Sequence, residues 1–284
     1  MHIRQIRIRN DAAPVAVILG SGDIASAIGR DLFKAGCGVL MLRDTAVPVL
    51  RRGMAFDDAL EDGVAELEGV WAVRAPAPEM VAALVRGREA VVLARLDLAV
   101  VAAGWQGVLD VLIDARVRKY AAPADLRPLA TCAIGVGPGF IGQENVDIAV
   151  ETLPGQEGDV VTHGPTAAPT GRSVPLGGAR EERFAYAVNS GPWDPKTALG
   201  TWVSVGDTIG WLGERRVDAP IAGCLRGLVR ETPNGIARGS KLAEIDPRVG
   251  APWTGVPPRA QRIAAGVKRA VAAILPVSPA LAAE

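Results

Sequence analysis

The apolar positions near the start of the chain follow two different periods. Residues 15–19, VAVIL, are apolar without interruption, which is typical of a strand buried on both faces of a parallel sheet. From Ala25 to Ala35 the apolar positions recur at helical spacing, and Gly36 ends that segment before a second apolar run at 39–42. The pattern predicts a strand–helix–strand unit.

Further apolar runs extend this pattern to about residue 150. We expect a helix at 78–87 and strands at 89–94, 109–115 and 131–136. From 154 to 175 the chain is rich in Gly, Pro and Thr, a composition typical of a connector. Short strands are expected beyond it, so the 284 residues should form about two domains.

Two similar stretches characterise the second part of the chain. Residues 203–212 and 235–245 each place a glycine and a polar residue before an apolar strand, and VDAPIAGCLRGLV lies between them. This arrangement resembles the biotinyl-lipoyl barrel-sandwich module, in which an AP-x-x-G turn is flanked by two V-x-x-G-x-x-L halves. Asp246-Pro247-Arg248 stands where that family would place its modifiable lysine, so we expect no swinging-arm role.

The predicted fold class is α/β: a Rossmann-like parallel sheet domain followed by a smaller β-rich barrel-sandwich-like domain and a C-terminal helix. The expected boundaries are 1–153, 154–257 and 258–284. Apolar residues at four-residue intervals from Ile263 to Leu275 predict the amphipathic terminal helix. Its expected role is packing, and a homodimer contact is the alternative.

The turn after the first strand is the first candidate site. Residues 20–25, GSGDIA, read G-x-G-x-x-A, and Asp44 closes the second strand about 20 residues on. Dinucleotide-binding folds hold a pyrophosphate at such a turn and place an acid there for the ribose hydroxyls. The alternative is that these glycines only allow a tight turn and close helix packing.

Other glycines and charged residues follow the later predicted strands. The carboxyl ends of parallel strands share one edge of a sheet, so we expect a crevice there that binds phosphate or pyrophosphate. For each basic residue taken singly, a solvated surface charge is the alternative. The predicted cofactor-binding residues are Gly20, Ser21, Gly22, Asp23, Asp44, Arg51, Arg52, Asp114, Arg116, Lys119, Gly135, Gly137 and Gly139.

Composition narrows the chemistry. With 31 basic and 31 acidic side chains the formal charge is zero, so neither nucleic acid nor a membrane is expected as a partner. The two histidines, His2 and His163, and the widely spaced Cys37, Cys132 and Cys224 suggest no metal site, and we name no catalytic residue. No apolar run reaches the roughly 20 residues that cross a bilayer, and the N-terminus has no signal-peptide core; a cytoplasmic location is expected.

Five motifs in order resemble a known family. They are GSGDIASAIGRDLFKAGCGVLML, VPVLRRGMAFDDALEDG, LIDARVRK, IGVGPGFIG with ENVDIAVET, and GCLRGLV followed by G-x-x-L-x-x-IDPR. Together they are similar to the accessory proteins of selenium-dependent molybdenum hydroxylase systems, and more distantly to xanthine dehydrogenase maturation factors. The resemblance covers about Val15 to Arg248. It implies a role in supplying or maturing the molybdenum cofactor, with molybdenum hydroxylase subunits as partners.

Three hypotheses on function are kept. The first is a non-catalytic accessory protein that binds a pterin nucleotide, the molybdenum cofactor, and hands it to a partner enzyme. The second is an NAD(P)-dependent oxidoreductase that binds NAD(P) at the glycine turn, with Tyr120 as its candidate proton donor. The third is a non-catalytic interaction module. Whether the chain is an enzyme is left open, and the accessory protein is ranked first.

Overall fold

The predicted strand–helix–strand unit is confirmed in the computed structural model, which describes residues 13–43, 47–105, 109–120 and 122–275. Strands β1 (Val15–Leu19) and β2 (Gly38–Leu42) are parallel neighbours, and α1 (Asp23–Lys34) connects them. Gly29 lets the helix approach the sheet, because a Cβ there would come within 3.1 Å of the Met41 sulfur. The local periodicity of the sequence is sufficient to specify this unit.

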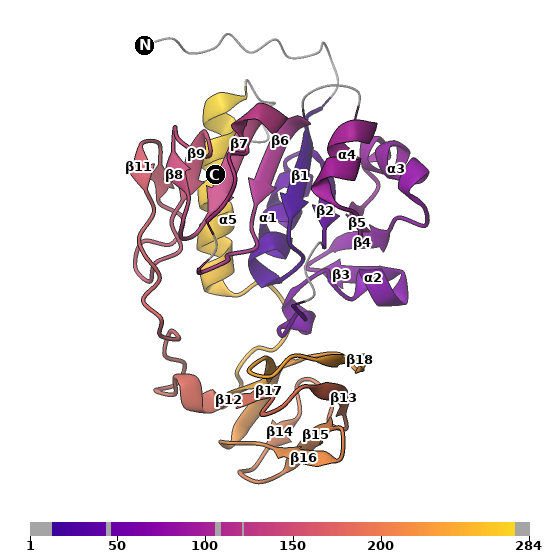
Figure 1. The fold of residues 1–284 in the computed structure, drawn as a ribbon, viewed down its shortest axis with the longest axis vertical. Coiled ribbons are helices and arrows are strands. Elements are labelled where there is room, and N and C mark those ends of the chain that lie inside the picture. The colour runs from indigo at the N-terminus through magenta and orange to yellow at the C-terminus, as the bar shows by residue number, and fades with distance from the viewer. Residues whose placement is uncertain (1–12, 44–46, 106–108, 121, 276–284) are drawn as a thin grey trace. The chain divides into compact units, whose positions relative to one another are not determined.

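β1 and β2 belong to a nine-stranded sheet with the order β10-β9-β7-β6-β1-β2-β5-β4-β3 (Figure 1). From β9 to β4 every neighbouring pair is parallel, whereas β3 pairs with β4, and β10 with β9, in antiparallel fashion. The other strands of this sheet are β3 (Val64–Leu67), β4 (Val70–Arg74), β5 (Val91–Ala94), β6 (Leu109–Asp114), β7 (Ala130–Val136), β9 (Ile148–Val150) and β10 (Val160–Val161).

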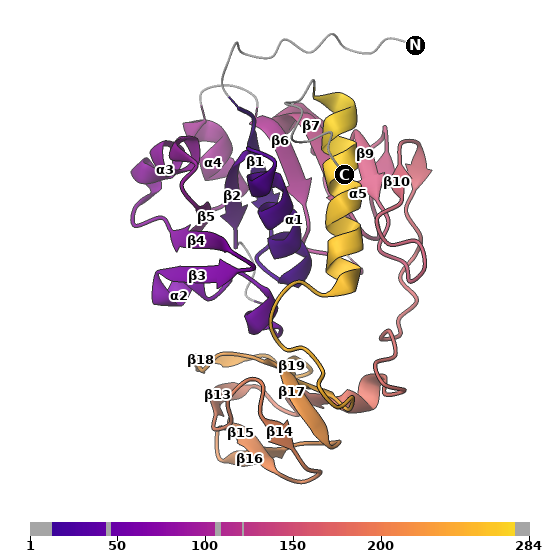
Figure 2. The ribbon, with the colours of Figure 1, turned by 180° about the vertical axis from the view of Figure 1, so that it is seen from behind.

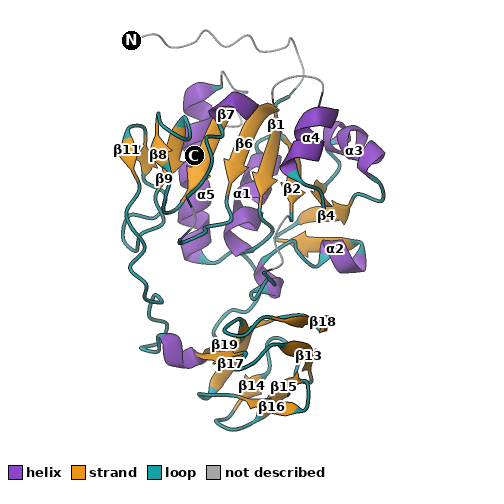
Figure 3. Cartoon of the chain, viewed as in Figure 1, coloured by secondary structure: helices purple, strands orange, loops and turns teal. Residues whose placement is uncertain are grey.

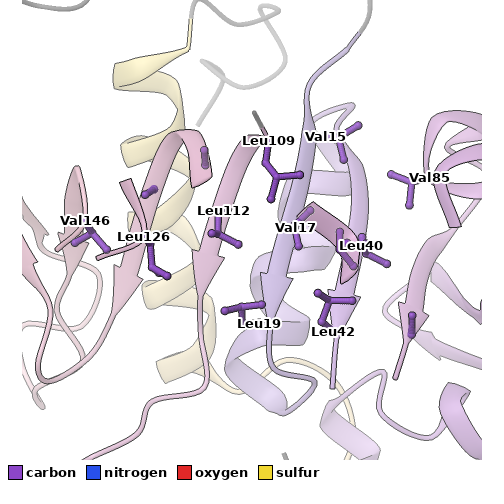
Figure 4. Close-up of a cluster of buried hydrophobic side chains, with 14 of the residues drawn as sticks. Val15, Val17, Leu19, Leu40, Leu42, Val85, Leu109, Leu112, Leu126 and Val146 are labelled. Carbon is purple, nitrogen blue, oxygen red and sulfur yellow. The ribbon is translucent and has the colours of Figure 1, made fainter. Parts of the chain in front are cut away.

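Helices cover both faces of this sheet (Figures 2 and 3). α1 and α5 (Pro258–Ile274) pack together on one face. α3 (Val81–Gly87) and α4 (Leu98–Gly104) pack on the other, where Val85 and Val101 join Val17 and Leu40 in one apolar cluster (Figure 4). The shorter elements are α2 (Ala59–Asp62), β8 (Ile141–Gly142), β11 (Gly164–Pro165), and the 3-10 turns η2 (Pro78–Met80) and η3 (Arg127–Leu129).

The β3–β4 hairpin at one edge of the sheet was not predicted. Its two-residue turn is Glu68-Gly69, with φ values of 48° and 80°. Positive φ at both positions is the geometry of a type I′ turn, which normally carries Asn-Gly or Asp-Gly. Because glutamate is unusual at the first turn position, the sequence did not indicate a hairpin here. The alternating pattern of 70–74 indicates a strand.

The chain divides into two compact units. Among the described residues, the first comprises 13–43, 56–169 and 257–275, and the second 47–55 and 170–256. The second contains two four-stranded antiparallel sheets, β12-β19-β17-β14 and β16-β15-β13-β18, around a core that includes Trp193 and Leu225. Its elements are η1 (Arg52–Met54), η4 (Glu181–Arg183), β12 (Phe184–Tyr186), β13 (Gly191–Pro195), β14 (Trp202–Val203), β15 (Thr208–Leu212), β16 (Arg215–Asp218), β17 (Gly223–Leu228), β18 (Thr232–Ile236) and β19 (Lys241–Asp246).

The predicted fold class, a Rossmann-like parallel sheet followed by a barrel-sandwich-like domain and a separate helix, is wrong. The large sheet is mixed, because short hairpins add an antiparallel strand at each edge. The second unit takes in the early segment 47–55, and the terminal helix packs on the first unit. The predicted domain boundaries after residues 153 and 257 stay predictions.

Within the described residues, the helices are all too short or too polar to cross a membrane.

Candidate functional site

The end of β1 lies where the strand order changes direction. β2 pairs with one side of β1, and β6, much later in the chain, pairs with the other side. In open α/β sheets, ligands bind outside the carboxyl ends of the strands at such a switch point. The two strand ends meet closely, because a Cβ on Gly20 would lie 3.3 Å from the carbonyl oxygen of Ala115. With φ at +113°, position 20 also favours glycine for its backbone conformation.

Gly22 differs from Gly20 in what it does for the fold. Gly22 is the N-cap of α1, and no side chain caps this N-terminus of the helix with a hydrogen bond. Its φ of −74° is accessible to any residue, and an added Cβ would meet no described atom within 4 Å. The fold therefore does not require glycine at 22. A ligand lying close over the helix N-terminus would require it, and N–H groups there favour anions.

Ser21, between the two glycines, is held by a buried carboxylate. Its hydroxyl donates to Asp57 Oδ1 at 2.5 Å, and Arg43 Nη1 lies 3.3 Å from Asp57 Oδ2. Burial raises the pKa of Asp57, and the Arg43 charge and the Ser21 hydrogen bond oppose that rise only in part. Ser26 Oγ in α1 accepts from the Phe56 N–H, so residues 56–57 are held both by the glycine turn and by α1.

The predicted pair Asp114 and Arg116 forms a closed fork at the end of β6. The Arg116 backbone N–H and Nε donate to Asp114 Oδ1 at 3.1 and 2.9 Å, and Nη2 donates to Oδ2 at 2.5 Å. Asp114 is buried and Arg116 is half-buried. Both residues lie at the predicted edge, but their charges compensate each other, so this pair adds little net field.

The other predicted basic residues are Arg51, Arg52 and Lys119. Arg51 and Arg52 belong to the second unit, where Arg51 Nε and Nη2 donate to Glu244 at 2.6 and 3.0 Å. Lys119 follows β6 and is exposed. Asp44 lies outside the described residues, whereas Asp23 is half-buried in the first turn of α1.

The three glycines predicted to bind a cofactor at the end of β7 have different structural surroundings. A Cβ on Gly135 would lie 2.0 Å from the Phe140 ring, so this buried residue accommodates packing within the fold. Gly137 is buried with φ at +93°, and its carbonyl accepts from the Thr166 hydroxyl at 2.7 Å. Gly139 is exposed with φ at +91°. Close packing and turn geometry account for these glycines without a ligand.

Asp57 is the residue that sequence reasoning missed. It is 36 positions from Ser21, so no local spacing connects the two. The only signal was a pair of aspartates after the apolar Ala55-Phe56 and before α2. Because Ser21, Asp57, Arg43, Asp114 and Arg116 all have partners, the donors that the edge offers a ligand are mainly the backbone N–H groups at the start of α1.

The nucleophilic and metal-binding side chains do not form a second centre in the described part of the chain. Cys37, Cys132 and Cys224 are buried, and burial raises the pKa of each thiol, that of Cys37 to about 12, which disfavours the reactive thiolate. His163 is exposed beside the Thr162 hydroxyl. Among the described residues, no three His, Cys, Asp or Glu side chains come together as metal ligands.

Comparisons with known proteins give one sequence relative. No family model matches the chain. It is 32% identical over 266 residues to the uncharacterized protein YqeB of Escherichia coli (strain K12), a match that covers 90% of this chain and 47% of YqeB. The chain thus spans about half the length of this relative.

Several solved structures match the chain with low scores. An aspartoacylase family protein of Mesorhizobium loti is 9% identical, with 84% of this chain and 86% of that chain covered and a TM-score of 0.25. The ectoine utilization protein EutE (DoeB) of Ruegeria pomeroyi is 16% identical, with coverages of 82% and 52% and a TM-score of 0.21. A succinylglutamate desuccinylase/aspartoacylase of Rhodobacter sphaeroides is 19% identical, with coverages of 30% and 29% and a TM-score of 0.22. Such low scores carry no argument about the activity of this chain.

The resemblance to molybdenum hydroxylase accessory proteins is not borne out, because no family model matches the chain and its sequence relative is an uncharacterized protein. The titles of these structures name desuccinylase and aspartoacylase proteins and an ectoine utilization protein, and none of the three names a molybdenum hydroxylase accessory protein. The family, the maturation function and the molybdenum hydroxylase partners are therefore wrong, and the oxidoreductase and interaction-module alternatives are not supported. The motifs misled because glycine turns and apolar strands recur in many α/β proteins for structural reasons.

Proposed function

We propose that the sheet edge at β1 and β6 binds a nucleoside phosphate. The observation that carries the proposal is Gly22: the fold leaves open space where its side chain would be, at the uncapped start of a 12-residue helix. The switch point of the strand order lies at the same edge, where sheets of this type bind ligands.

The phosphate is held by backbone donors in this proposal. The first N–H groups of α1 have no carbonyl partner within the helix, and the helix dipole favours a negative charge beside them. The Ser21 hydroxyl is directed to Asp57, and Arg116 is directed to Asp114. In this proposal these two side-chain pairs hold the turn in place, and the backbone N–H groups bind the phosphate.

Thermal unfolding of the purified protein with ADP, CTP, NAD and adenosine tests the proposal. A ligand that binds only the native state stabilises it by about 2.7 kcal/mol at 100 times its Kd. We expect stabilisation by at least one of the three phosphate-bearing compounds and none by adenosine. Equal responses to adenosine and ADP, or no response to any compound, would contradict the proposal.

Two substitutions at Gly22 separate charge from close approach. Gly22→Asp places a carboxylate beside the phosphate, and two like charges at short range cost enough to weaken binding about 100-fold. Gly22→Ala should weaken binding less, by obstructing the backbone alone. Aspartate is a favoured N-cap residue, so Gly22→Asp should keep or slightly raise the melting temperature.

Gly104→Asp is the matched control, because position 104 also offers open space at a φ outside the positive range. It should leave nucleotide affinity unchanged. Unaltered affinity in Gly22→Asp would remove this turn from the binding site.

A further inference from the structure

The carboxyl edge of the large sheet also carries a cavity, which is lined by residues other than those of the glycine turn. A cavity of about 200 Å³ opens at the carboxyl ends of β4 and β5. Arg74 and Ala75 contribute from the end of β4, and Ala94 and Arg95 from the end of β5. None of the residues at the glycine turn lines it, so the inference below does not rest on the proposed nucleotide site.

The inner wall of the cavity is apolar. Leu60, Val81 and Ala94 reach it from α2, α3 and β5, and each is almost completely buried. Pro76 and Pro78 form part of the opening, and the fixed φ of proline limits how far this wall moves. A wall of this kind accepts a small apolar group with little rearrangement.

The charge at the opening is positive. Arg74 and Arg95 line the cavity and no acidic side chain does. Arg74 donates from Nη1 to the Leu60 carbonyl at 2.9 Å, and within the described part of the chain no carboxylate forms an ion pair with it. Arg95 pairs with Glu61. The cavity therefore carries one guanidinium charge that no side chain compensates.

We infer that this cavity binds a small organic anion with an apolar body. The planar guanidinium of Arg74 matches the geometry of a carboxylate or a phosphate, which it can engage through two N–H groups. The volume is below the roughly 300–1,000 Å³ of sites for drug-sized ligands, which limits the body to about one ring or one short branched chain.

Saturation-transfer NMR with four probes tests this inference. Benzoate and phenyl phosphate carry the ring and an anionic group, benzamide is neutral, and acetate has no apolar body. We expect saturable binding of at least one of the two aromatic anions, about tenfold tighter than that of benzamide or acetate, because a hydrogen bond to a charged group is lost with benzamide. The preferred anion distinguishes a carboxylate ligand from a phosphate ligand.

Arg74→Gln removes the charge at an exposed position and should weaken binding of the preferred anion about tenfold while benzamide is unaffected. Arg215→Gln, an exposed arginine in the second unit, is the control and should change neither. The inference is overturned if no aromatic anion binds saturably, if benzamide binds as tightly as the anions, or if Arg74→Gln binds them like the wild type.

Discussion

At the scale of single residues, Asp57 is the clearest case of a group whose chemistry depends on its surroundings. The Asp57 side chain is almost fully buried, and it accepts a hydrogen bond from the hydroxyl of Ser21, 36 positions earlier in the chain. Its pKa is raised from 3.8, because burial disfavours the charged form more than Arg43 and Ser21 favour it.

The raised pKa of Asp57 makes the stability of the folded protein depend on pH. An acid with a raised pKa binds its proton more tightly in the folded state, so its contribution to the free energy of unfolding is largest below pH 3.8 and falls as the pH rises through the raised pKa. Asp57→Asn removes that dependence. Urea unfolding of both proteins from about pH 4 to about pH 7 should show the wild type losing stability relative to the variant.

Asp97→Asn, at an exposed position, is the control for a lost surface carboxylate and should give a difference from wild type that changes little with pH. A pH-independent difference for Asp57→Asn as well would show that Asp57 titrates alike in the folded and unfolded states.

At the scale of elements, a buried ion pair ties an early segment to a late strand within the second unit. Glu244 on β19 is fully buried and accepts from Arg51, next to η1, and from Arg183 Nε at 3.0 Å in η4. Burial alone would raise the pKa of Glu244. The charge and hydrogen bonds of Arg51, the hydrogen bond of Arg183 and the charge of Arg226 outweigh the effect of burial and hold the pKa at about 2.

Glu244→Gln should therefore destabilise the protein strongly near neutral pH. Breaking a buried ion pair leaves uncompensated charge and costs about 3–5 kcal/mol. A depressed pKa contributes stability that is present above the ordinary value of 4.5 and is lost as the pH falls toward 2, so the variant and the wild type should converge in that range. Chemical unfolding at about pH 7 and about pH 3 measures this.

Glu231→Gln at an exposed position of the same unit is the matched control and should change stability by less than about 0.5 kcal/mol. A similarly small effect of Glu244→Gln at neutral pH would mean that the buried cluster adds no net stability.

At the scale of the whole molecule, the chain leaves the first unit twice and returns to it twice. The last return is α5, which packs on α1 and on β7, β9 and β10. Gly266 and Gly158 allow this approach, because a Cβ on Gly266 would lie 2.2 Å from the Gly158 carbonyl oxygen. Packing within the chain is thus the observed role of the terminal helix.

Gly266→Val should lower the stability of the first unit by about 3 kcal/mol, because backbone atoms on the opposing segment cannot yield easily. Circular dichroism in the helix region reports on it, since α1 and α5, the longest described helices, both lie in this unit. Gly104→Val, at a position with open space, is the control. A melting temperature equal to that of the control would refute the tight α5 contact.

The sequence by itself determined the elements whose signal is local. The strand–helix–strand unit, the helical segment at 78–87, the parallel strands β5, β6 and β7 and the terminal helix are all present near their expected positions. Their apolar periods and glycine punctuation act over a few residues, so neighbours along the chain suffice to specify them. The turn at 20–22 could be predicted for the same reason.

Only the tertiary structure decided which distant groups meet. It assigned Arg51 to Glu244, 193 positions away, and it placed Asp57 against Ser21, 36 positions away. It also joined segment 47–55 to the later residues of the second unit. Burial of a charge and steric contact depend on segments that are remote in sequence, and periodicity carries no information on them.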